Sequence, residues 1–318
     1  MKDIFKKMNE FGESRTPFFF IIDFEMEKPI IHALDDLPCT LQYTFNGAPD
    51  NKANLGKKLE LERFPFDQKA FSKSFQEVLK EINYGNSFLL NLTFPSKIKM
   101  NFSLEEIYAA AAAKYMVLKE DDFVSFSPET FVTIRENSIF SYPMKGTIDA
   151  SIPGAESIIL ANKKEEAEHY TIVDLIRNDL ARVSTNVEVT KFRYIDEIKT
   201  HSKSLLQVSS EIKGDLPDDW HKTLGNIFRD LLPAGSISGA PKKKTLEIIR
   251  KNEFDKRGYY TGIAGRYDGN NLDSCVLIRF IEQKDDAFTF RSGGGITYRS
   301  DEEEEYQELI QKIYVPVF

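Results

Sequence analysis

The stretch DFVSFSPETFVTIRENSIFSYPMKGT, residues 122–147, contains three strand-like runs in direct succession. The runs are Asp122–Ser125, Thr130–Arg135 and Ser138–Pro143, with turns between them. Strands that follow one another in this way pair antiparallel, whereas a parallel sheet requires a crossover, usually a helix, between successive strands. The stretch therefore favours an α+β fold with antiparallel sheets.

The segments on either side alternate between helical and strand-like patterns. Helices are predicted at Gln68–Asn83, Ser103–Lys114, about Lys164–Arg182, Leu205–Ile212 and near Glu302–Tyr314. Further strands are predicted at Phe18–Phe24, Leu41–Phe45, Phe88–Phe94 and Val187–Tyr194. No stretch has the composition of a domain linker. We therefore expect residues 66–318 to form one domain, with residues 1–65 as a short, strand-rich segment packed on it.

The composition narrows the class of protein. Of the 318 residues, 41% are hydrophobic and 29% charged, which is typical of a globular chain, and the net charge of −8 argues against a nucleic-acid partner. No apolar run reaches the roughly 18 residues that span a bilayer, and the N-terminus has no cleavable leader pattern. Two cysteines, Cys39 and Cys275, are too few for a disulfide framework or a structural zinc site. We expect a cytoplasmic protein.

Two predicted helices carry paired carboxylates. Glu165 and Glu168 lie three residues apart and hence on one helix face, which continues into apolar residues. Glu305 and Glu308 repeat this spacing near the C-terminus, with Lys312 on the same face. Four such carboxylates could hold a hard divalent cation, Mg²⁺ above all. The alternative for each pair alone is a solvated, acidic first turn of a helix.

Two glycine-rich stretches suggest an anion site. RSGGGIT (Arg291–Thr297) follows a predicted strand, and AGSISGAPKKK (Ala234–Lys244) precedes a helix that starts near Pro241. Consecutive glycines let backbone N–H groups approach a ligand closely. Neither stretch has the spacing of a known nucleotide-binding motif, and tight turns are the alternative interpretation.

Taken together, these stretches resemble the chorismate-utilising enzymes, a family that includes anthranilate synthase component I, aminodeoxychorismate synthase component I and isochorismate synthase. The resemblance runs from about residue 70 to the C-terminus. It rests on GNSFLLNLT (Gly85–Thr93), FSPETF (Phe126–Phe131), YPMKGT (Tyr142–Thr147), EEAEHYTIVDLIRNDLARV (Glu165–Val183), GSISGAPK (Gly235–Lys242), RGYYTGIAG (Arg257–Gly265), LIRF (Leu277–Phe280), RSGGGIT and SDEEEEYQELIQK (Ser300–Lys312). It implies antiparallel sheets that form a sandwich with helices on the outside.

Within this family, the residue at the position of Lys145 separates the activities. Anthranilate and isochorismate synthases typically have a small residue there, whereas aminodeoxychorismate synthases typically have lysine in a Pro-Ile-Lys-Gly-Thr signature. The sequence PMKGT matches the lysine-containing signature except at Met144. The resemblance implies that Lys145 is a nucleophile, which adds at C2 of chorismate as the C4 hydroxyl leaves, before ammonia enters at C4 and displaces it.

The resemblance also implies roles for the other site residues. Glu129 would act as general acid and base, and Glu165, Glu168, Glu305 and Glu308 would hold Mg²⁺, which clamps the ring carboxylate of chorismate. Carboxylate contacts would come from Tyr260, Arg279, Lys312 and the amides of Gly293, Gly294 and Gly295. Ser236 and Thr147 would supply pocket hydroxyls.

Two positions depart from the family pattern. Leu206 stands where anthranilate synthases have histidine, and Leu89 where many relatives have glutamine. Both changes argue against anthranilate synthesis. The N-terminal region that carries a tryptophan site in anthranilate synthases is short here, so we expect no inhibition by tryptophan.

The sequence therefore predicts amination of chorismate to 4-amino-4-deoxychorismate, on the route to p-aminobenzoate and folate. No glutaminase motif is present, so the ammonia would be free or come from a separate glutamine amidotransferase subunit. The alternatives are anthranilate or isochorismate synthesis, which Lys145 disfavours, and a non-catalytic chorismate-binding subunit. The full set of four glutamates with Lys145 argues against loss of catalysis.

Overall fold

The computed structural model describes residues 3–47, 55–199 and 204–316. The helices are α1 (Ile4–Glu13), α2 (Gln68–Asn83), α3 (Leu104–Ala110), α4 (Ala155–Ala161), α5 (Lys163–Leu180), α6 (Leu224–Leu231), α7 (Gly235–Ser238), α8 (Lys242–Asn252) and α9 (Glu302–Gln311), with 3₁₀ helices η1 (Leu34–Asp36) and η2 (Trp220–Thr223). The strands are β1 (Phe18–Ile22), β2 (Ile30–Ala33), β3 (Leu41–Phe45), β4 (Leu61–Phe64), β5 (Leu89–Met100), β6 (Tyr115–Lys119), β7 (Phe123–Ser127), β8 (Thr130–Arg135), β9 (Ser138–Ser141), β10 (Met144–Asp149), β11 (Thr185–Lys199), β12 (Ser204–Asp215), β13 (Gly239–Ala240), β14 (Ile263–Tyr267), β15 (Leu272–Val276), β16 (Phe280–Lys284) and β17 (Ala287–Ile296).

The chain divides into two compact units, each built from separated segments. Unit 1 comprises residues 1–17, 130–236 and 267–273, and unit 2 comprises residues 18–129, 237–266 and 274–318. This division differs from the expected boundary after residue 65. Antiparallel pairing places strands from distant parts of the chain in one sheet, so a compact unit need not be continuous in sequence. Residues 48–54 of the N-terminal segment lie outside the described residues.

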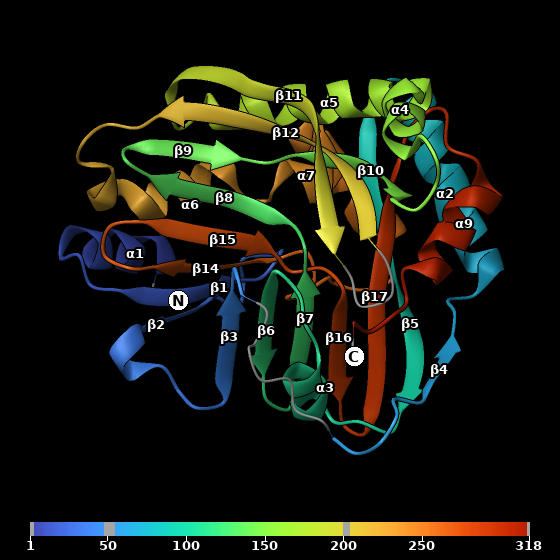
Figure 1. The fold of residues 1–318 in the computed structure, drawn as a ribbon, viewed down its shortest axis with the longest axis horizontal. Coiled ribbons are helices and arrows are strands. Elements are labelled where there is room, and N and C mark those ends of the chain that lie inside the picture. Colours follow the sequence, from blue (N-terminus) through green and yellow to red (C-terminus); the bar gives the residue numbers. More distant parts are fainter. Residues whose placement is uncertain (1–2, 48–54, 200–203, 317–318) are drawn as a thin grey trace. The chain divides into compact units, whose positions relative to one another are not determined.

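Unit 1 is organised around antiparallel strands in the order β10-β12-β9-β8, with β11 also paired to β12. Helix α5 lies along β11 and β12 (Figure 1). At the N-terminal part of the unit, α1 packs directly against η2 and α6. A Cβ added at Gly12 would lie 1.9 Å from the carbonyl oxygen of His221, so the glycine permits this backbone contact.

Unit 2 contains an antiparallel sheet in the order β13-β5-β17-β16-β7-β6-β3, with β4 paired to β5. The long strands β5 and β17 run side by side over nine residue pairs, from Phe288 opposite Ile98 to Ile296 opposite Leu90 (Figure 1). Strand β1 pairs with β2 in the same unit. The α+β class with antiparallel sheets is thus confirmed.

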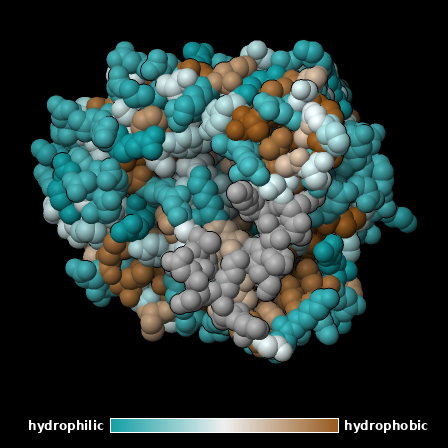
Figure 2. Space-filling model, viewed as in Figure 1, coloured by the Kyte–Doolittle hydropathy of each residue, from teal (hydrophilic) through white to brown (hydrophobic). Residues whose placement is uncertain are grey.

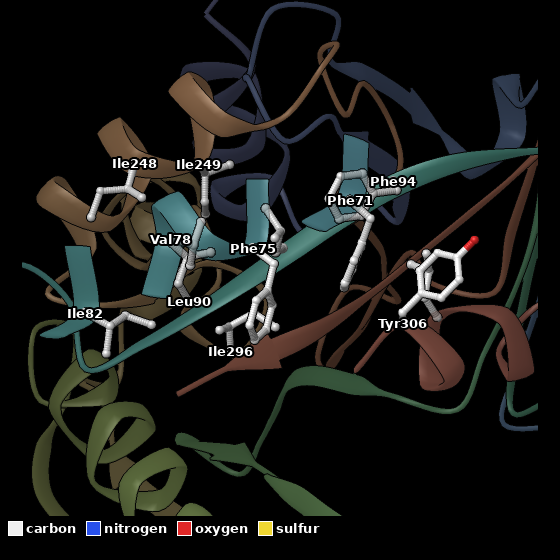
Figure 3. Packing of buried hydrophobic residues seen from close by; sticks show 12 residues of the cluster. Phe71, Phe75, Val78, Ile82, Leu90, Phe94, Ile248, Ile249, Ile296 and Tyr306 are labelled. Atoms are coloured by element: carbon white, nitrogen blue, oxygen red, sulfur yellow. The ribbon is translucent and has the colours of Figure 1, made fainter. Parts of the chain in front are cut away.

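One hydrophobic cluster of unit 2 packs α2, α8 and α9 against β5 and β17. Its buried residues are Phe71, Phe75, Val78, Ile82, Leu90, Leu92, Phe94, Ile248, Ile249, Ile296, Tyr306 and Leu309. Figure 3 shows the α2 side chains turned toward the strand residues, with Tyr306 of α9 at the other end. Helix α9 is therefore held on β17 through an apolar face, which leaves its opposite residues to carry charge.

Most predicted elements form where they were expected, but one predicted helix is a strand and one observed helix was not predicted. Helix α2 has the predicted bounds, and α3 begins at the predicted place, with a capping box of Ser103 and Glu106. The prediction of a helix at Leu205–Ile212 was wrong, because these residues lie in β12, which pairs with β9, β10 and β11. Helix α1 lies in a segment expected to be strand-rich.

No helix in the described residues combines the length and the apolar character needed to cross a membrane. On the face drawn in Figure 2, hydrophobic residues are scattered among hydrophilic ones. Single exposed apolar residues of this kind are normal in globular proteins.

Candidate active site

Lys145 lies in a β-bulge of unit 1. Met144 pairs with Ser209 of β12, and Thr147 pairs with Gln207, so that Lys145 and Gly146 together oppose one residue of β12. Gly146 has a φ of +86°, a conformation that glycine adopts without strain. A bulge redirects the side chains of its strand, and such bulges often lie next to active sites. The PMKGT segment is therefore an interrupted strand.

The bulge brings Lys145 to the carboxylates of α5. Lys145 Nζ lies 2.6 Å from Glu168 Oε2, and the two side chains are 36% and 16% exposed. Gly146 lies opposite Glu165, since a Cβ at this position would come within 3.3 Å of Glu165 Oε2. The glycine thus keeps open the space beside the first carboxylate, while the lysine contacts the second.

The orientation of α5 follows from its buried face. His169, Ile172 and Ile176 are buried, which continues the stripe predicted from Glu165 and Glu168. His169 Nε2 lies 2.7 Å from Ser210 Oγ on β12. Burial, and then the nearby Arg193 guanidinium, lower the pKa of His169 to about 4, so this histidine is neutral at pH 7. It therefore anchors the helix through a hydrogen bond.

Thr147 and Ser236 are the remaining predicted residues of unit 1. Thr147 is exposed on β10, directly opposite Gln207, and residues paired in this way point to the same face of the sheet. Leu206 pairs with Ile148 and so points to the other face. The polar side chain beside Thr147 is thus Gln207, which the sequence analysis did not single out. Ser236 is partly buried on α7.

Helix α9 repeats this arrangement in unit 2. Lys312 Nζ lies 2.5 Å from Glu308 Oε1 and donates a hydrogen bond of 2.7 Å to the carbonyl oxygen of Gly293. A Cβ added at Gly294 would lie 3.0 Å from Glu305 Oε2 and 3.9 Å from Glu308 Oε1. As in unit 1, a lysine contacts the second glutamate and a glycine keeps open the space beside the first.

The three glycines lie within strand β17, where a turn or an anion-binding loop was considered. They pair with Thr93, Leu92 and Asn91 of β5. The carbonyl group of Gly293 points to Lys312 and away from β5. In a strand, the N–H and C=O groups of one residue point to the same side of the strand. The amides of Gly293 and Gly295 therefore both face away from β5. Leu89 covers Gly295, because a Cβ there would lie 3.2 Å from Leu89 Cδ1.

Tyr260 and Arg279 have distinct environments in unit 2. Tyr260 is buried, and burial raises the pKa of its phenol to about 12, so the hydroxyl remains a hydrogen-bond donor at neutral pH. Arg279 is partly exposed, has a φ of +53°, and donates from Nε to the hydroxyl of Tyr314 at 3.1 Å. Its guanidinium also lies 5.3 Å from the centroid of the Tyr314 ring, a cation–π contact.

A buried ion pair supports the segment that carries Tyr260. Arg257 and Glu253 have side chains that are 1% and 5% exposed and contact each other at 2.7 Å. Arg257 also donates to the carbonyl oxygens of Asn91 and Ile237, each at 2.7 Å. Sequence reasoning missed this pair, although the spacing of four residues between opposite charges was a signal for it.

Glu129 lies between β7 and β8 and is partly buried. Its backbone N–H donates to Ser127 Oγ at 3.1 Å, and its carbonyl oxygen accepts from Val276 N at 3.1 Å. These contacts fix the backbone of the Ser-Pro-Glu turn. The residue as a whole is not fully buried.

The predicted residues are divided between the units. Unit 1 holds Lys145, Thr147, Glu165, Glu168 and Ser236, and unit 2 holds Glu129, Tyr260, Arg279, Gly293, Gly294, Gly295, Glu305, Glu308 and Lys312. Within the described residues, no three His, Cys, Asp or Glu side chains form a cluster that by itself suits a metal ion. Each carboxylate pair, however, faces a cradle that a Cβ would fill, and oxygen ligands suit Mg²⁺.

Several known proteins are similar in sequence to this chain. An uncharacterized PabA-like protein of Pasteurella multocida (strain Pm70) is 52% identical over 316 residues, which cover 98% of each chain. An uncharacterized PabA-like protein of Haemophilus influenzae is 49% identical over 320 residues, covering 100% of this chain and 97% of that protein. Aminodeoxychorismate synthase component 1 of Bacillus subtilis (strain 168) is 29% identical over 265 residues, covering 79% of this chain and 55% of that protein.

Solved structures share the fold. Anthranilate synthase component I from Streptococcus pneumoniae TIGR4 has a TM-score of 0.68 at 26% identity and covers 81% of this chain and 59% of that chain. The menaquinone-specific isochorismate synthase of Escherichia coli has a TM-score of 0.70 at 15% identity, covering 97% and 79%, which shows the fold alone. A family profile described as chorismate binding enzyme matches residues 23–317. The chain therefore belongs to the chorismate binding enzyme family.

Proposed function

We propose that the chain aminates chorismate at C4 and yields 4-amino-4-deoxychorismate, a precursor of p-aminobenzoate and folate, in the cytoplasm. The observation that carries the proposal is Lys145, which lies in a strand bulge, 2.6 Å from a carboxylate of the acidic helix. The similarity to the Bacillus subtilis aminodeoxychorismate synthase supports the same activity. A lysine at this place supplies an amine nucleophile, which a small residue could not.

In the proposed first step, the neutral amine of Lys145 forms a bond to C2 of chorismate. The ring double bond shifts, the C4–O bond breaks, and the hydroxyl leaves as water with a proton from Glu129. In the second step, ammonia bonds to C4, the double bond returns, and the C2–N bond to Lys145 breaks. Glu129 then takes a proton from the new ammonium group at C4, so both the lysine and the carboxylic acid are regenerated, and one hydroxyl is exchanged for one amino group.

The contact between Lys145 and Glu168 sets a condition on this chemistry. An adjacent carboxylate stabilises the charged ammonium form, which has no lone pair for attack. The ion pair must therefore open before Lys145 can react. Glu165, Glu168, Glu305 and Glu308 would hold Mg²⁺, which would supply positive charge for the ring carboxylate of chorismate. Binding of the ion to Glu168 would weaken the ion pair of this carboxylate with Lys145.

The remaining residues would bind and orient the substrate. Tyr260 donates a hydrogen bond from its neutral phenol, and Arg279 and Lys312 offer positive charge to the enolpyruvyl and ring carboxylates. The amides of Gly293 and Gly295, which face away from β5, add donors without side chains in the way. Gly294 leaves room beside Glu305. Thr147, Ser236 and Gln207 would line the substrate pocket with polar groups.

The source of ammonia is a separate glutamine amidotransferase, or free ammonium in its absence. Both cysteines lack the setting of a glutaminase nucleophile: Cys39 is exposed near the turn before β3, and Cys275 is buried inside β15. The chain would then be active with ammonium salts alone, and glutamine would support turnover only when the partner is added.

The test is to incubate the purified chain with chorismate, Mg²⁺ and ammonium and to resolve the products by mass spectrometry. We expect aminodeoxychorismate from the wild type and none from Lys145→Ala. The matched control is Lys163→Ala, which removes an exposed lysine that pairs with Glu166. Release of pyruvate with anthranilate, or full activity of Lys145→Ala, would contradict the proposal.

A further inference from the structure

Ser210 of β12 lies beside two interruptions of the unit 1 sheet. On one side, Lys191 pairs with Glu211 and Tyr194 pairs with Ser209, so Phe192 and Arg193 together oppose Ser210. On the other side, the bulge at Lys145 begins after the pair of Met144 and Ser209. A bulge interrupts the ladder of backbone hydrogen bonds, so its amides need other acceptors. Ser210 lies directly opposite the bulge of β11 and is adjacent to Ser209, the residue at which the bulge of β10 begins.

The hydroxyl of Ser210 joins three elements and is fully buried. Its oxygen accepts a hydrogen bond of 3.0 Å from the backbone N–H of Arg193, in the bulge of β11. The same hydroxyl forms a hydrogen bond of 2.7 Å with His169 Nε2 of α5, in which the donor depends on the tautomer of the imidazole. Ser210 therefore links the bulge of β11 to helix α5.

The backbone of Ser210 binds the strand that carries the lysine. Its N–H donates a hydrogen bond of 2.9 Å to the carbonyl oxygen of Pro143, two residues before Lys145. His169 directly follows Glu168 in α5. Ser210 is thus hydrogen-bonded both to the residue before β10 and to the turn of α5 that bears Glu168. These are the two segments that carry the 2.6 Å contact between Lys145 and Glu168.

We propose that Ser210 and His169 are positioning residues, which together hold Lys145 against the carboxylates of α5. The inference rests on the proposed function only in the chemical role that it gives to Lys145. Without the hydroxyl, both the buried imidazole and the Arg193 amide lose a partner, and α5 can shift relative to β10. A displacement of about 1 Å at a reacting group can cost roughly a hundredfold in rate.

The experiment compares Ser210→Ala and His169→Phe with His169→Gln, whose amide can still form a hydrogen bond with Ser210. Ser141→Ala is the matched control, because Ser141 is also a buried serine of this sheet and donates to the carbonyl of Phe131 at 3.0 Å. The intact protein, without chorismate, is treated with a short pulse of an amine-acylating reagent. Mass spectrometry then gives the labelling rate of Lys145 relative to the exposed Lys163.

We expect Lys145 to be labelled about fivefold faster in Ser210→Ala and His169→Phe, as for the loss of a partly exposed ion pair. In His169→Gln and Ser141→Ala, labelling should match the wild type. In the amination assay, kcat should fall about tenfold or more in the first two variants with KM for chorismate unchanged.

Equal labelling of Lys145 in His169→Phe and His169→Gln would overturn the inference, and this pair decides the matter even if Ser210→Ala does not fold. Faster labelling in Ser141→Ala, to the same degree, would also overturn it, because a general loss of stability would then explain the effect. If the wild type makes no aminodeoxychorismate, the proposed function fails, while the labelling comparison still decides the positioning role.

Discussion

Replacing Arg257 by methionine tests the structural support beneath Tyr260. In the wild type, Arg257 Nε and Nη2 donate to the two carboxylate oxygens of Glu253 at 2.9 and 2.7 Å. Two backbone carbonyls, of Asn91 and Ile237, also depend on this guanidinium. Methionine fills much of the same volume but has no donor, so the carboxylate of Glu253 would remain buried without its counter-ion.

The expected cost is large because the pair is almost fully buried. Removing one partner of a buried ion pair costs about 3–5 kcal/mol, and each carbonyl left without its donor adds about 1 kcal/mol. The sum is of the same order as the whole free energy of unfolding of a typical domain, about 5–15 kcal/mol. Thr93, which donates its N–H and hydroxyl to Glu253 at 2.9 Å, cannot replace a full positive charge.

The assay is urea unfolding at 25 °C followed by far-UV circular dichroism. The control is Lys256→Met in the adjacent residue, whose 2.6 Å ion pair with Glu27 joins side chains that are 67% and 50% exposed. We expect Lys256→Met to unfold near the wild-type midpoint and Arg257→Met far below it. Glu253→Gln in the Arg257→Met background should restore part of the loss, since it removes the unpaired charge.

An Arg257→Met midpoint close to that of Lys256→Met would refute the reasoning, because burial would then have no bearing on the cost. A double variant that is less stable than Arg257→Met would refute the account of the buried charge, while it would leave a packing role for the arginine.

Three further predictions concern stability and the site. His221 is buried, and burial is the main cause that lowers its pKa to about 4. Between pH 6.5 and 4, the unfolded chain therefore binds a proton at this residue that the folded chain does not, so the contribution of His221 to the free energy of unfolding should fall by about 1.5 kcal/mol from pH 6.5 to 5. Urea titrations of His221→Gln should show a dependence on pH that is flatter by this amount. Gly294→Ala places a Cβ 3.0 Å from Glu305 Oε2, so titration calorimetry should show weaker Mg²⁺ binding, while the urea midpoint of unfolding stays unchanged. An unchanged Mg²⁺ affinity would contradict the proposed role of the open space beside Glu305. Gly12→Ala places a Cβ 1.9 Å from the carbonyl oxygen of His221, so the free energy of unfolding, measured with urea, should fall by about 1–3 kcal/mol. The control is Gly47→Ala, whose Cβ would have no neighbour nearer than 3.8 Å and should not lower the free energy of unfolding in this way.

The features that the sequence determined by itself depend on residues close together in the chain. Helix α2 starts after Asp67, which accepts from the N–H of Ala70, and α3 has its capping box, because caps act over three residues. The pairs Glu165 with Glu168 and Glu305 with Glu308 share helix faces because an α-helix turns about every 3.6 residues. Family membership was also readable, since its motifs are short and ordered along the chain.

The tertiary structure alone decided features that depend on partners far away in the chain. Residues 205–212 became a strand because β12 is paired on both sides, which outweighs local preference. The glycine run became part of β17 through its register with β5. The bulge that turns Lys145 toward Glu168, and the hydrogen bonds of Ser210 that support it, join segments that are distant in the chain. Local propensity carries no information about such pairings, because their energy comes from contacts that form only when the sheet is assembled.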